Sequence, residues 1–212
     1  MRALIAGITG RAIVLFARFL TAVRAIWAGV DPVPGQRVYF ANHTSNGDFI
    51  LLWSVLPPRL REDTRPVAAL DYWLKTPLRA FVGREVFRAV LIDRRPEART
   101  ADPVTQMAEA LDKGSSLILF PEGQRNASDA PLLPFKSGLY HLARARPAVD
   151  LVPVWIENLN RVMPKGEIVP VPLLCTVTFG APLRLAEGED KAVFLERASL
   201  ALLALRPARE AA

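Results

Sequence analysis

Short apolar runs alternate with segments of helical periodicity along most of the chain. The apolar runs read as strands at residues 37–43, 66–74, 115–120, 149–156 and 173–180. Apolar positions with helical spacing predict helices at residues 48–57, 99–114, 139–146 and 190–206, and residues 81–95 are expected to pass from a helix into a strand. Apolar strands that alternate with helices are typical of a mainly parallel sheet covered on both faces. We therefore predict an α/β fold with a mainly parallel central sheet flanked by helices.

Turn-forming residues divide the chain into two parts. The cluster "DPVPGQ" at residues 31–36 ends the first segment. The 212 residues suffice for one α/β domain with its own core but are few for two. We expect an N-terminal segment at residues 1–30 and one α/β domain at residues 31–212, which includes the C-terminal helix. The proline-rich residues 162–173 are expected to form a surface excursion.

The first thirty residues are apolar and contain no acidic side chain. Four arginines interrupt them, namely Arg2, Arg11, Arg18 and Arg24. The longest uncharged run, residues 3–10, is well short of the ~20 residues of a spanning helix, and no secretory cleavage site follows a continuous apolar core. We predict a helix, or a pair broken at Gly7 and Gly10, at a membrane interface where arginines face anionic lipids and Trp27 meets head groups. The alternative is a helix packed only on its own domain.

Composition favours anionic partners. The chain has 27 basic and 21 acidic residues, a net charge of +6, and a mean hydropathy of +0.19. Nucleic acid is not expected as a partner because the arginines are scattered, aromatic residues are not interleaved with them, and zinc or helix-turn-helix signatures are lacking. Cys175 is the only cysteine and lies in an apolar run, so we interpret it as a buried structural thiol in a reducing compartment.

One of the two histidines, His43, ends the predicted strand at residues 37–43 and lies in the turn-forming sequence "NHTSNGD". Imidazole suits proton transfer near neutral pH because its unperturbed pKa is about 6.5. Asp48 follows five residues later and could hold the second ring nitrogen, fix the tautomer and stabilise the imidazolium. Alternatively, the two side chains only cap the turn and the following helix. Ser45 could also be a nucleophile with His43 as its base, although it lacks an elbow signature.

Further charged residues follow other predicted strands. The loop "FPEGQRN" presents Glu122, Gly123 and Arg125, and the run "VLIDRR" ends in Arg94 and Arg95. Glycine permits close approach of a ligand, and arginine offers a planar fork of donors to phosphate or carboxylate. Ligands of parallel sheets bind outside the carboxyl ends of the strands. We therefore expect these residues to converge with the histidine at one edge of the sheet.

Four sequence blocks together resemble a known family. The blocks "NHTSNGD", "VLIDR", "FPEGQRN" followed by "PFKSG", and "LVPVWI" have the order and approximate spacing of those in the lysophosphatidic acid acyltransferase family, the glycerolipid acyltransferases of the PlsC type. The resemblance extends from about residue 35 to residue 182. The combination of NH-x₄-D with FPEG-x-R is highly specific.

The resemblance implies a role for each matching residue. His43 would be the general base for a hydroxyl of the acceptor lipid, and Asp48 its orienting partner. The hydroxyl would attack the thioester of acyl-CoA or acyl carrier protein directly, without an acyl-enzyme, so no cofactor or metal is needed. Arg94 and Arg125 match arginines associated with the acceptor phosphate.

Three further positions belong to the same comparison. Glu122 and Gly123 match the pair that shapes the acceptor site, Pro153 matches the proline of the fourth block, and Lys136 in "PFKSG" is a further candidate for substrate binding. His141 has no aspartate at the spacing of the first motif, and we interpret it as structural.

Two positions depart from the family pattern. Gln124 stands where the family commonly has threonine or serine, and Asn126 where it often has serine. These changes concern the loop beside the acceptor head group, so they bear on which head group is accepted.

The sequence therefore predicts a membrane-associated enzyme that acylates lysophosphatidic acid to phosphatidic acid. We expect a peripheral protein on the cytoplasmic face of the inner membrane, in contact with anionic lipids, in a bacterium. One alternative is another acceptor, either a different lysophospholipid or an aminolipid. Two further alternatives are a membrane-docking protein without catalysis and a hydrolase of acyl thioesters.

Overall fold

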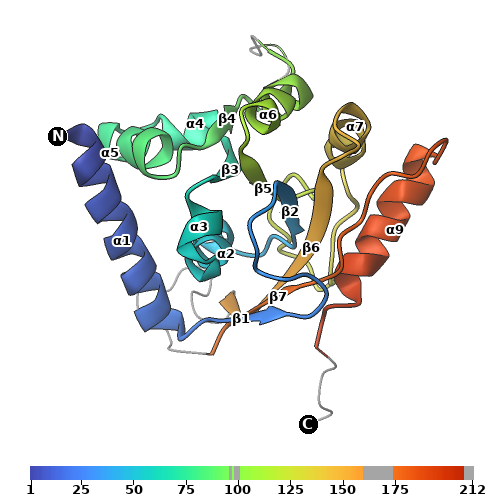
Figure 1. Cartoon of the computed structure of the whole chain (residues 1–212), viewed down its shortest axis with the longest axis horizontal. Coiled ribbons are helices and arrows are strands. Elements are labelled where there is room, and N and C mark those ends of the chain that lie inside the picture. Colours follow the sequence, from blue (N-terminus) through green and yellow to red (C-terminus); the bar gives the residue numbers. More distant parts are fainter. Residues whose placement is uncertain (96, 98–100, 160–173, 208–212) are drawn as a thin grey trace.

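The structure is a computed structural model that describes residues 1–95, 97, 101–159 and 174–207 (Figure 1). Within these residues, seven strands form one sheet with the order β1-β7-β6-β2-β5-β3-β4. The strands are β1 (Arg24–Trp27), β2 (Arg37–Ala41), β3 (Thr64–Ala69), β4 (Val90–Ile92), β5 (Ser116–Leu119), β6 (Asp150–Glu157) and β7 (Thr176–Phe179).

Most neighbouring strands are parallel. β2 lies between β5 and β6 and is parallel to both, with Phe40 opposite Leu119 and Pro153. β3 continues the parallel sheet from β5 to β4. β7 is antiparallel to β6, while β1 is parallel to β7. The predicted α/β fold with a mainly parallel sheet is confirmed.

Helices cover both faces of the sheet. Figure 1 shows α7 and α9 on one side of the sheet and α1 and α2 on the other. The helices are α1 (Arg2–Thr21), α2 (Asp48–Val55), α3 (Pro58–Arg61), α4 (Leu70–Trp73), α5 (Pro77–Phe81), the π-helix η1 (Val82–Val86), α6 (Pro103–Asp112), α7 (Gly138–Ala145) and α9 (Lys191–Leu203).

Successive side chains of β2 point to opposite faces of the sheet and belong to two separate cores. Tyr39 and Ala41 point to the core that contains α2, whereas Val38 and Phe40 point to the core that contains α6, α7 and α9. All four side chains are fully buried. A strand buried on both faces needs apolar residues at every position, which explains why this run lacks the alternation of a half-exposed strand.

The N-terminal segment begins with one helix. Of the two alternatives, a single helix or a pair broken at Gly7 and Gly10, the single helix is present, because α1 is continuous through both glycines. A side-chain carbon added at Gly10 would lie 3.3 Å from Val86 Cγ1 and 3.6 Å from Trp53, so this glycine allows close packing of the helix. Within the segment predicted at residues 1–30, α1 ends at Thr21 and β1 joins the sheet, so the helix covers only its first part.

The surface of α1 bears on the membrane prediction. By length and composition alone, α1 could cross a membrane. Its large exposed apolar side chains are Leu4, Ile5, Ile8, Leu15, Phe16 and Phe19. An exposed apolar helix is a candidate for contact with lipid, so the interfacial position stays a prediction.

Two other predicted elements need comment. The strand predicted at residues 66–74 ends at Ala69, and α4 takes up Leu70–Trp73, because Trp73 turns into the core beneath α2 beside Phe49. The excursion predicted at residues 162–173 lies entirely outside the described residues.

Candidate active site

The turn between β2 and α2 fixes the histidine ring. His43 Nδ1 lies 2.9 Å from Asp48 Oδ2. The same oxygen accepts hydrogen bonds from the backbone N–H groups of Thr44, at 2.6 Å, and Ser45, at 2.8 Å. Because a carboxylate oxygen only accepts, Nδ1 carries the ring proton and Nε2 keeps its lone pair. The predicted arrangement of the two side chains is present.

The position of the ring is also restricted by its neighbours. The imidazole stacks on Phe120, with 4.3 Å between ring centres and 21° between ring planes. The His43 side chain is 21% exposed, whereas that of Asp48 is fully buried. The ring is therefore accessible to a substrate while its partner is shielded from water.

The "FPEGQRN" loop holds the backbone of His43 on both sides. Glu122 Oε1 accepts a hydrogen bond from His43 N–H at 2.7 Å, and Asn126 N–H donates to the His43 carbonyl at 2.6 Å. The second carboxylate oxygen of Glu122 accepts from Leu133 N–H at 2.8 Å. Burial raises the pKa of Glu122, and the two backbone hydrogen bonds oppose this effect. Glu122 thus connects the two loops and does not line the cavity beside His43.

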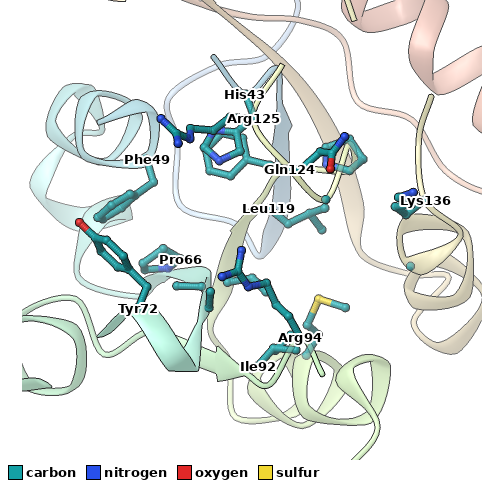
Figure 2. Close-up of a pocket in the computed structure, with 18 of the residues that line it drawn as sticks. His43, Phe49, Pro66, Tyr72, Ile92, Arg94, Leu119, Gln124, Arg125 and Lys136 are labelled. Atoms are coloured by element: carbon teal, nitrogen blue, oxygen red, sulfur yellow. The ribbon is translucent and has the colours of Figure 1, made fainter. Parts of the chain in front are cut away.

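A cavity of about 680 Å³ adjoins the histidine (Figure 2). Its polar side chains come from several loops and include His43, Arg94, Gln124, Arg125 and Lys136. Its apolar side chains come from β3, β4, β5, α6 and α7 and include Val67, Ile92, Leu119, Met107 and Leu139. A volume of this size suits a small ligand or part of a larger one. The cavity therefore combines a cationic region beside a base with an apolar region.

The cationic side chains differ in their surroundings. Among the described residues, Arg125 and Lys136 have no ion-pair partner. Arg94 forms an ion pair with Asp71, with 2.8 Å between Nη2 and Oδ2. This contact is the largest cause that lowers the pKa of Asp71. Arg95 instead pairs with Asp93 at 3.0 Å and does not line the cavity.

Gly123 allows Lys136 to pack across the loop. Its φ of +71° is in the left-handed region, and an added side-chain carbon would lie 3.1 Å from Lys136 Cγ. The loop is closed by hydrogen bonds from Gly123 N–H to the Phe120 carbonyl, at 3.0 Å, and from Lys136 N–H to the Pro121 carbonyl, at 2.7 Å. Glycine is needed here for both backbone conformation and space.

Two contributions were not predicted from the sequence. Asn42 forms a pair of hydrogen bonds with the backbone of Ile156, at 2.9 and 2.7 Å, and so connects the end of β2 to β6. Asp71, the partner of Arg94, is the second. Asn42 directly precedes the histidine in the first block, which was the available signal, whereas no motif pointed to Asp71.

The other candidates occupy different surroundings. The Ser45 hydroxyl accepts a hydrogen bond from Gly47 N–H at 3.3 Å and does not line the cavity, which disfavours a nucleophilic role. His141 is exposed on α7 against Tyr140, and Pro153 is buried in β6. Cys175 is fully buried. In the part of the chain that the structure describes, no group of three or more His, Cys, Asp or Glu side chains could hold a metal ion.

The fold and the site together define an α/β protein in which a histidine oriented by an aspartate adjoins a cavity. Comparison with known families identifies the family. The family model described as "Acyltransferase" matches residues 25–157, so the chain belongs to this acyltransferase family.

Named relatives narrow the comparison. The chain is 29% identical over 164 residues to mouse (Mus musculus) 1-acyl-sn-glycerol-3-phosphate acyltransferase alpha. The aligned region covers 74% of this chain and 53% of the relative. It is 29% identical over 141 residues to the 1-acyl-sn-glycerol-3-phosphate acyltransferase of Escherichia coli K12. Here the aligned region covers 60% of this chain and 52% of the relative. The chain thus spans about half the length of these relatives.

A solved structure shares the fold. The 1-acyl-sn-glycerophosphate (LPA) acyltransferase PlsC from Thermotoga maritima has a TM-score of 0.69 and 19% sequence identity. The match covers 94% of this chain and 79% of that chain. At this level of identity the likeness concerns the fold.

Proposed function

We propose that this protein is a membrane-associated O-acyltransferase that transfers a fatty acyl group from an acyl thioester to the free hydroxyl of lysophosphatidic acid, giving phosphatidic acid. The observation that carries the proposal is the oriented pair of His43 and Asp48 at the wall of a cavity that Arg125 and Lys136 also line. The relatives named above, which are 1-acyl-sn-glycerol-3-phosphate acyltransferases, support this acceptor.

The chemistry requires one base. His43 Nε2 takes the proton from the acceptor hydroxyl as its oxygen attacks the thioester carbonyl. The new C–O bond forms, the C–S bond breaks, and the imidazolium returns the proton to the departing thiolate. Asp48 stabilises the imidazolium through Nδ1. A positioned general base contributes about 10²- to 10⁴-fold to the rate.

The cationic side chains provide the acceptor subsite. Arg125 and Lys136 are exposed at the cavity and can donate to the phosphate of lysophosphatidic acid. Arg94 can do the same once the phosphate replaces the carboxylate of Asp71. Glu122 and Gly123 shape this subsite through the backbone of His43 and the position of Lys136. Holding the phosphate keeps the acceptor hydroxyl near the base.

The apolar region and the surface complete the proposal. Met107, Leu119 and Leu139 line the part of the cavity suited to an acyl chain. Either acyl-CoA or acyl carrier protein can deliver this chain, since both are acidic and the protein is basic. The exposed apolar residues of α1 support contact with a membrane, and the position that we propose is a peripheral one at the cytoplasmic face. No cofactor takes part in these steps.

The decisive experiment measures thiol release from acyl-CoA by the purified full chain in detergent, with and without lysophosphatidic acid. We expect release that depends on the acceptor in the wild type and falls about 10²- to 10⁴-fold in His43→Ala. His141→Ala is the matched control, because this second histidine is exposed outside the cavity. Its activity should equal that of the wild type.

Other outcomes contradict the proposal in distinct ways. Thiol release at full rate without an acceptor would indicate a thioester hydrolase. Release from neither acyl-CoA nor acyl carrier protein, with every lysolipid tested, would indicate a docking protein without catalysis.

A second acceptor class is favoured by one residue. Gln124 lines the cavity in place of the threonine or serine common in the family, and its amide can both donate and accept. This favours a lysolipid with a further polar group, such as another lysophospholipid or an aminolipid. A panel of lysolipids decides, because product from such an acceptor but none from lysophosphatidic acid would replace the leading proposal.

A further inference from the structure

Two arginines meet outside the cavity, at the carboxyl end of α2. Arg18 of α1 donates to the Ser54 carbonyl from Nη2 at 2.8 Å and from Nε at 3.2 Å. Arg61, the last residue of α3, donates from Nη2 to the Leu56 carbonyl at 2.7 Å and to the Ser54 carbonyl at 3.4 Å. Two full positive charges therefore share one carbonyl oxygen.

Helix capping explains only part of this arrangement. The carboxyl end of a helix carries about half of a negative charge, which two guanidinium groups exceed. Among the described residues, neither Arg18 nor Arg61 has an ion-pair partner. Burial is the main cause that lowers the pKa of Arg61; the charge of Arg18 adds to this effect, and the opposing effect of Glu62 is smaller. Within the described part of the chain, Glu62 thus offsets only part of the positive charge of the pair.

The Arg61 guanidinium is held in place but not satisfied. It lies over the Trp53 ring, with 5.3 Å between its central carbon and the ring centre. Its Nε is buried, and so is Trp53 Nε1, and neither has a hydrogen-bond partner in the described part of the chain, so neither can reach a ligand. Nη1 of Arg61 and Nη1 of Arg18 donate no hydrogen bond among the described residues. These two groups are the guanidinium donors that a phosphate would use.

The surrounding surface indicates where a phosphate would come from. Leu15 is one helical turn before Arg18 and is 68% exposed, and the adjacent Phe19 is 84% exposed. Apolar side chains of this size on an exposed helix suit the acyl region of a lipid layer, while arginines suit its anionic head groups. Neither arginine lines the cavity beside His43.

We infer that Arg18 and Arg61 form a second phosphate-binding site, which takes the head-group phosphate of an anionic membrane phospholipid while the side chains of α1 contact its acyl region. The site rests on the membrane association proposed above, and it is separate from the acceptor subsite. Two charge-assisted contacts from different helices would fix how the protein lies on the membrane.

The test uses substitutions that keep the charge. Lysine retains the positive charge but loses the planar fork and the stacking on Trp53. The full-length Arg18→Lys and Arg61→Lys proteins are compared with Arg11→Lys on α1 and Arg59→Lys on α3. These two control arginines are exposed and make no side-chain hydrogen bond among the described residues.

Binding is measured by co-sedimentation with vesicles of phosphatidylcholine, with and without about 30% phosphatidylglycerol. We expect Arg18→Lys and Arg61→Lys each to weaken binding to the anionic vesicles about tenfold, because hydrogen bonds to a charged group are lost. Each control should stay within about twofold of the wild type. Binding to neutral vesicles should be the same for all five proteins.

Three results would overturn the inference. The first is equal binding by the paired and control variants, which would mean general surface charge. The second is unchanged vesicle binding together with arginine-dependent binding of inorganic phosphate in calorimetry, which would mean a site for a soluble anion. The third is an equal loss on neutral vesicles. Thermal unfolding verifies that each variant is folded, and the exposed Arg18 serves as the test if Arg61→Lys does not fold.

The outcome is independent of catalysis. The His43→Ala protein should bind anionic vesicles as the wild type does, because His43 is outside the second site. If no acyl transfer is found for the wild type but the arginine dependence is present, the proposed reaction fails and the lipid site stands. If acyl transfer occurs but vesicle binding does not depend on the two arginines, the proposed reaction stands and the lipid site fails.

Discussion

At the residue scale, the properties of His43 depend on contacts from three directions. Asp48 holds Nδ1, Phe120 stacks on the ring, and the "FPEGQRN" loop holds the backbone. Each contact restricts a different degree of freedom, namely the tautomer, the ring plane and the position of the main chain. The site is therefore organised before a substrate binds, which is how an enzyme avoids reorganisation during the reaction.

Replacing Asp48 by asparagine tests the first of these contacts. We expect kcat to fall about 10²- to 10⁴-fold with little change in KM, because the imidazolium loses its anionic partner. The free energy of unfolding should also fall by about 1–3 kcal/mol, since two backbone N–H groups lose a charged acceptor. Steady-state kinetics and urea unfolding measure both effects. Asp190→Asn, at the N-cap of α9, is the control, and a kcat within threefold of the control would contradict the assignment.

The buried carboxyl of Glu122 predicts a dependence of stability on pH. Its pKa is raised by burial above the ordinary value of 4.5, so the unfolded chain loses this proton at a lower pH than the folded protein does. The contribution to stability is therefore fully present below pH 4.5 and is lost as the pH rises through the folded pKa.

In Glu122→Gln we expect this decrease with pH to be absent, as measured by urea unfolding across a pH series. The amide NH₂ would also face one of the two N–H donors, so kcat should fall as the backbone of His43 loses its clamp. A curve of stability against pH that parallels that of the wild type would contradict the interpretation. Glu187→Gln is a control for the removal of one negative charge, because Glu187 is exposed and does not line the cavity.

At the element scale, the loop between β5 and α7 positions both the histidine and a cation. It binds the His43 backbone through Glu122 and Asn126, and it carries Arg125 and Lys136 to the cavity. Gly123 is the point where the loop turns. A change in the shape of this loop should thus affect acceptor binding.

Gly123→Ala separates backbone strain from crowding. Both Gly123 and Gly188 have a φ of +71°, but only at Gly123 would a side-chain carbon meet another residue, Lys136 Cγ at 3.1 Å. Each substitution should lower the free energy of unfolding by about 1–2 kcal/mol. Only Gly123→Ala should raise KM for the acceptor, because it displaces Lys136. Equal KM values for the two variants would show that Lys136 does not contact the acceptor.

Local patterns predicted the parts of the site that lie close in sequence. His43 and Asp48 are five residues apart within one turn, so their contact follows from the spacing. The role of Glu122 was not predictable, because it depends on a hydrogen bond between residues 79 apart in the chain. The pairing of Arg94 with Asp71 likewise depends on the packing of α4 against the sheet.

The errors in the fold have a similar cause. β1 is only four residues long and follows an apolar helix without a clear turn signal, so its sequence reads as a continuation of the helix. Its strand conformation comes from pairing with β7, which lies about 150 residues later in the chain. Leu70–Trp73 has residues common in strands but becomes helical because Trp73 packs into the core.

At the scale of the whole molecule, the two cores lie on opposite faces of one sheet. Cys175 belongs to the core that contains α2, and its reactivity is a measure of how often that core opens. Its side chain is fully buried, and burial raises the pKa of the thiol to about 11. At pH 8 only about one thiol in a thousand would be ionised, and none would be accessible.

We therefore expect the folded protein to react with a thiol reagent at pH 8 at least about a hundredfold more slowly than the protein in 6 M guanidinium chloride. The reaction rate should follow the unfolding of the sheet, since β7 begins at the next residue. Labelling of the native protein as fast as that of the unfolded protein would show that this core opens readily. Cys175→Ala provides the background rate.

The connection between α1 and β1 consists of two residues, Ala22 in the left-handed conformation and Val23. β1 is held in register by β7, and Cys175 N–H donates to the Thr21 carbonyl at 3.1 Å. Arg18 also bonds to the Ser54 carbonyl of α2, so α1 cannot swing about this connection without losing these hydrogen bonds. Whatever angle the helix takes to a lipid layer is then transmitted as a rigid-body tilt to the sheet and to the mouth of the cavity. A substrate drawn from such a layer would consequently have to travel to the histidine by its own movement, along a path whose length is set by the protein.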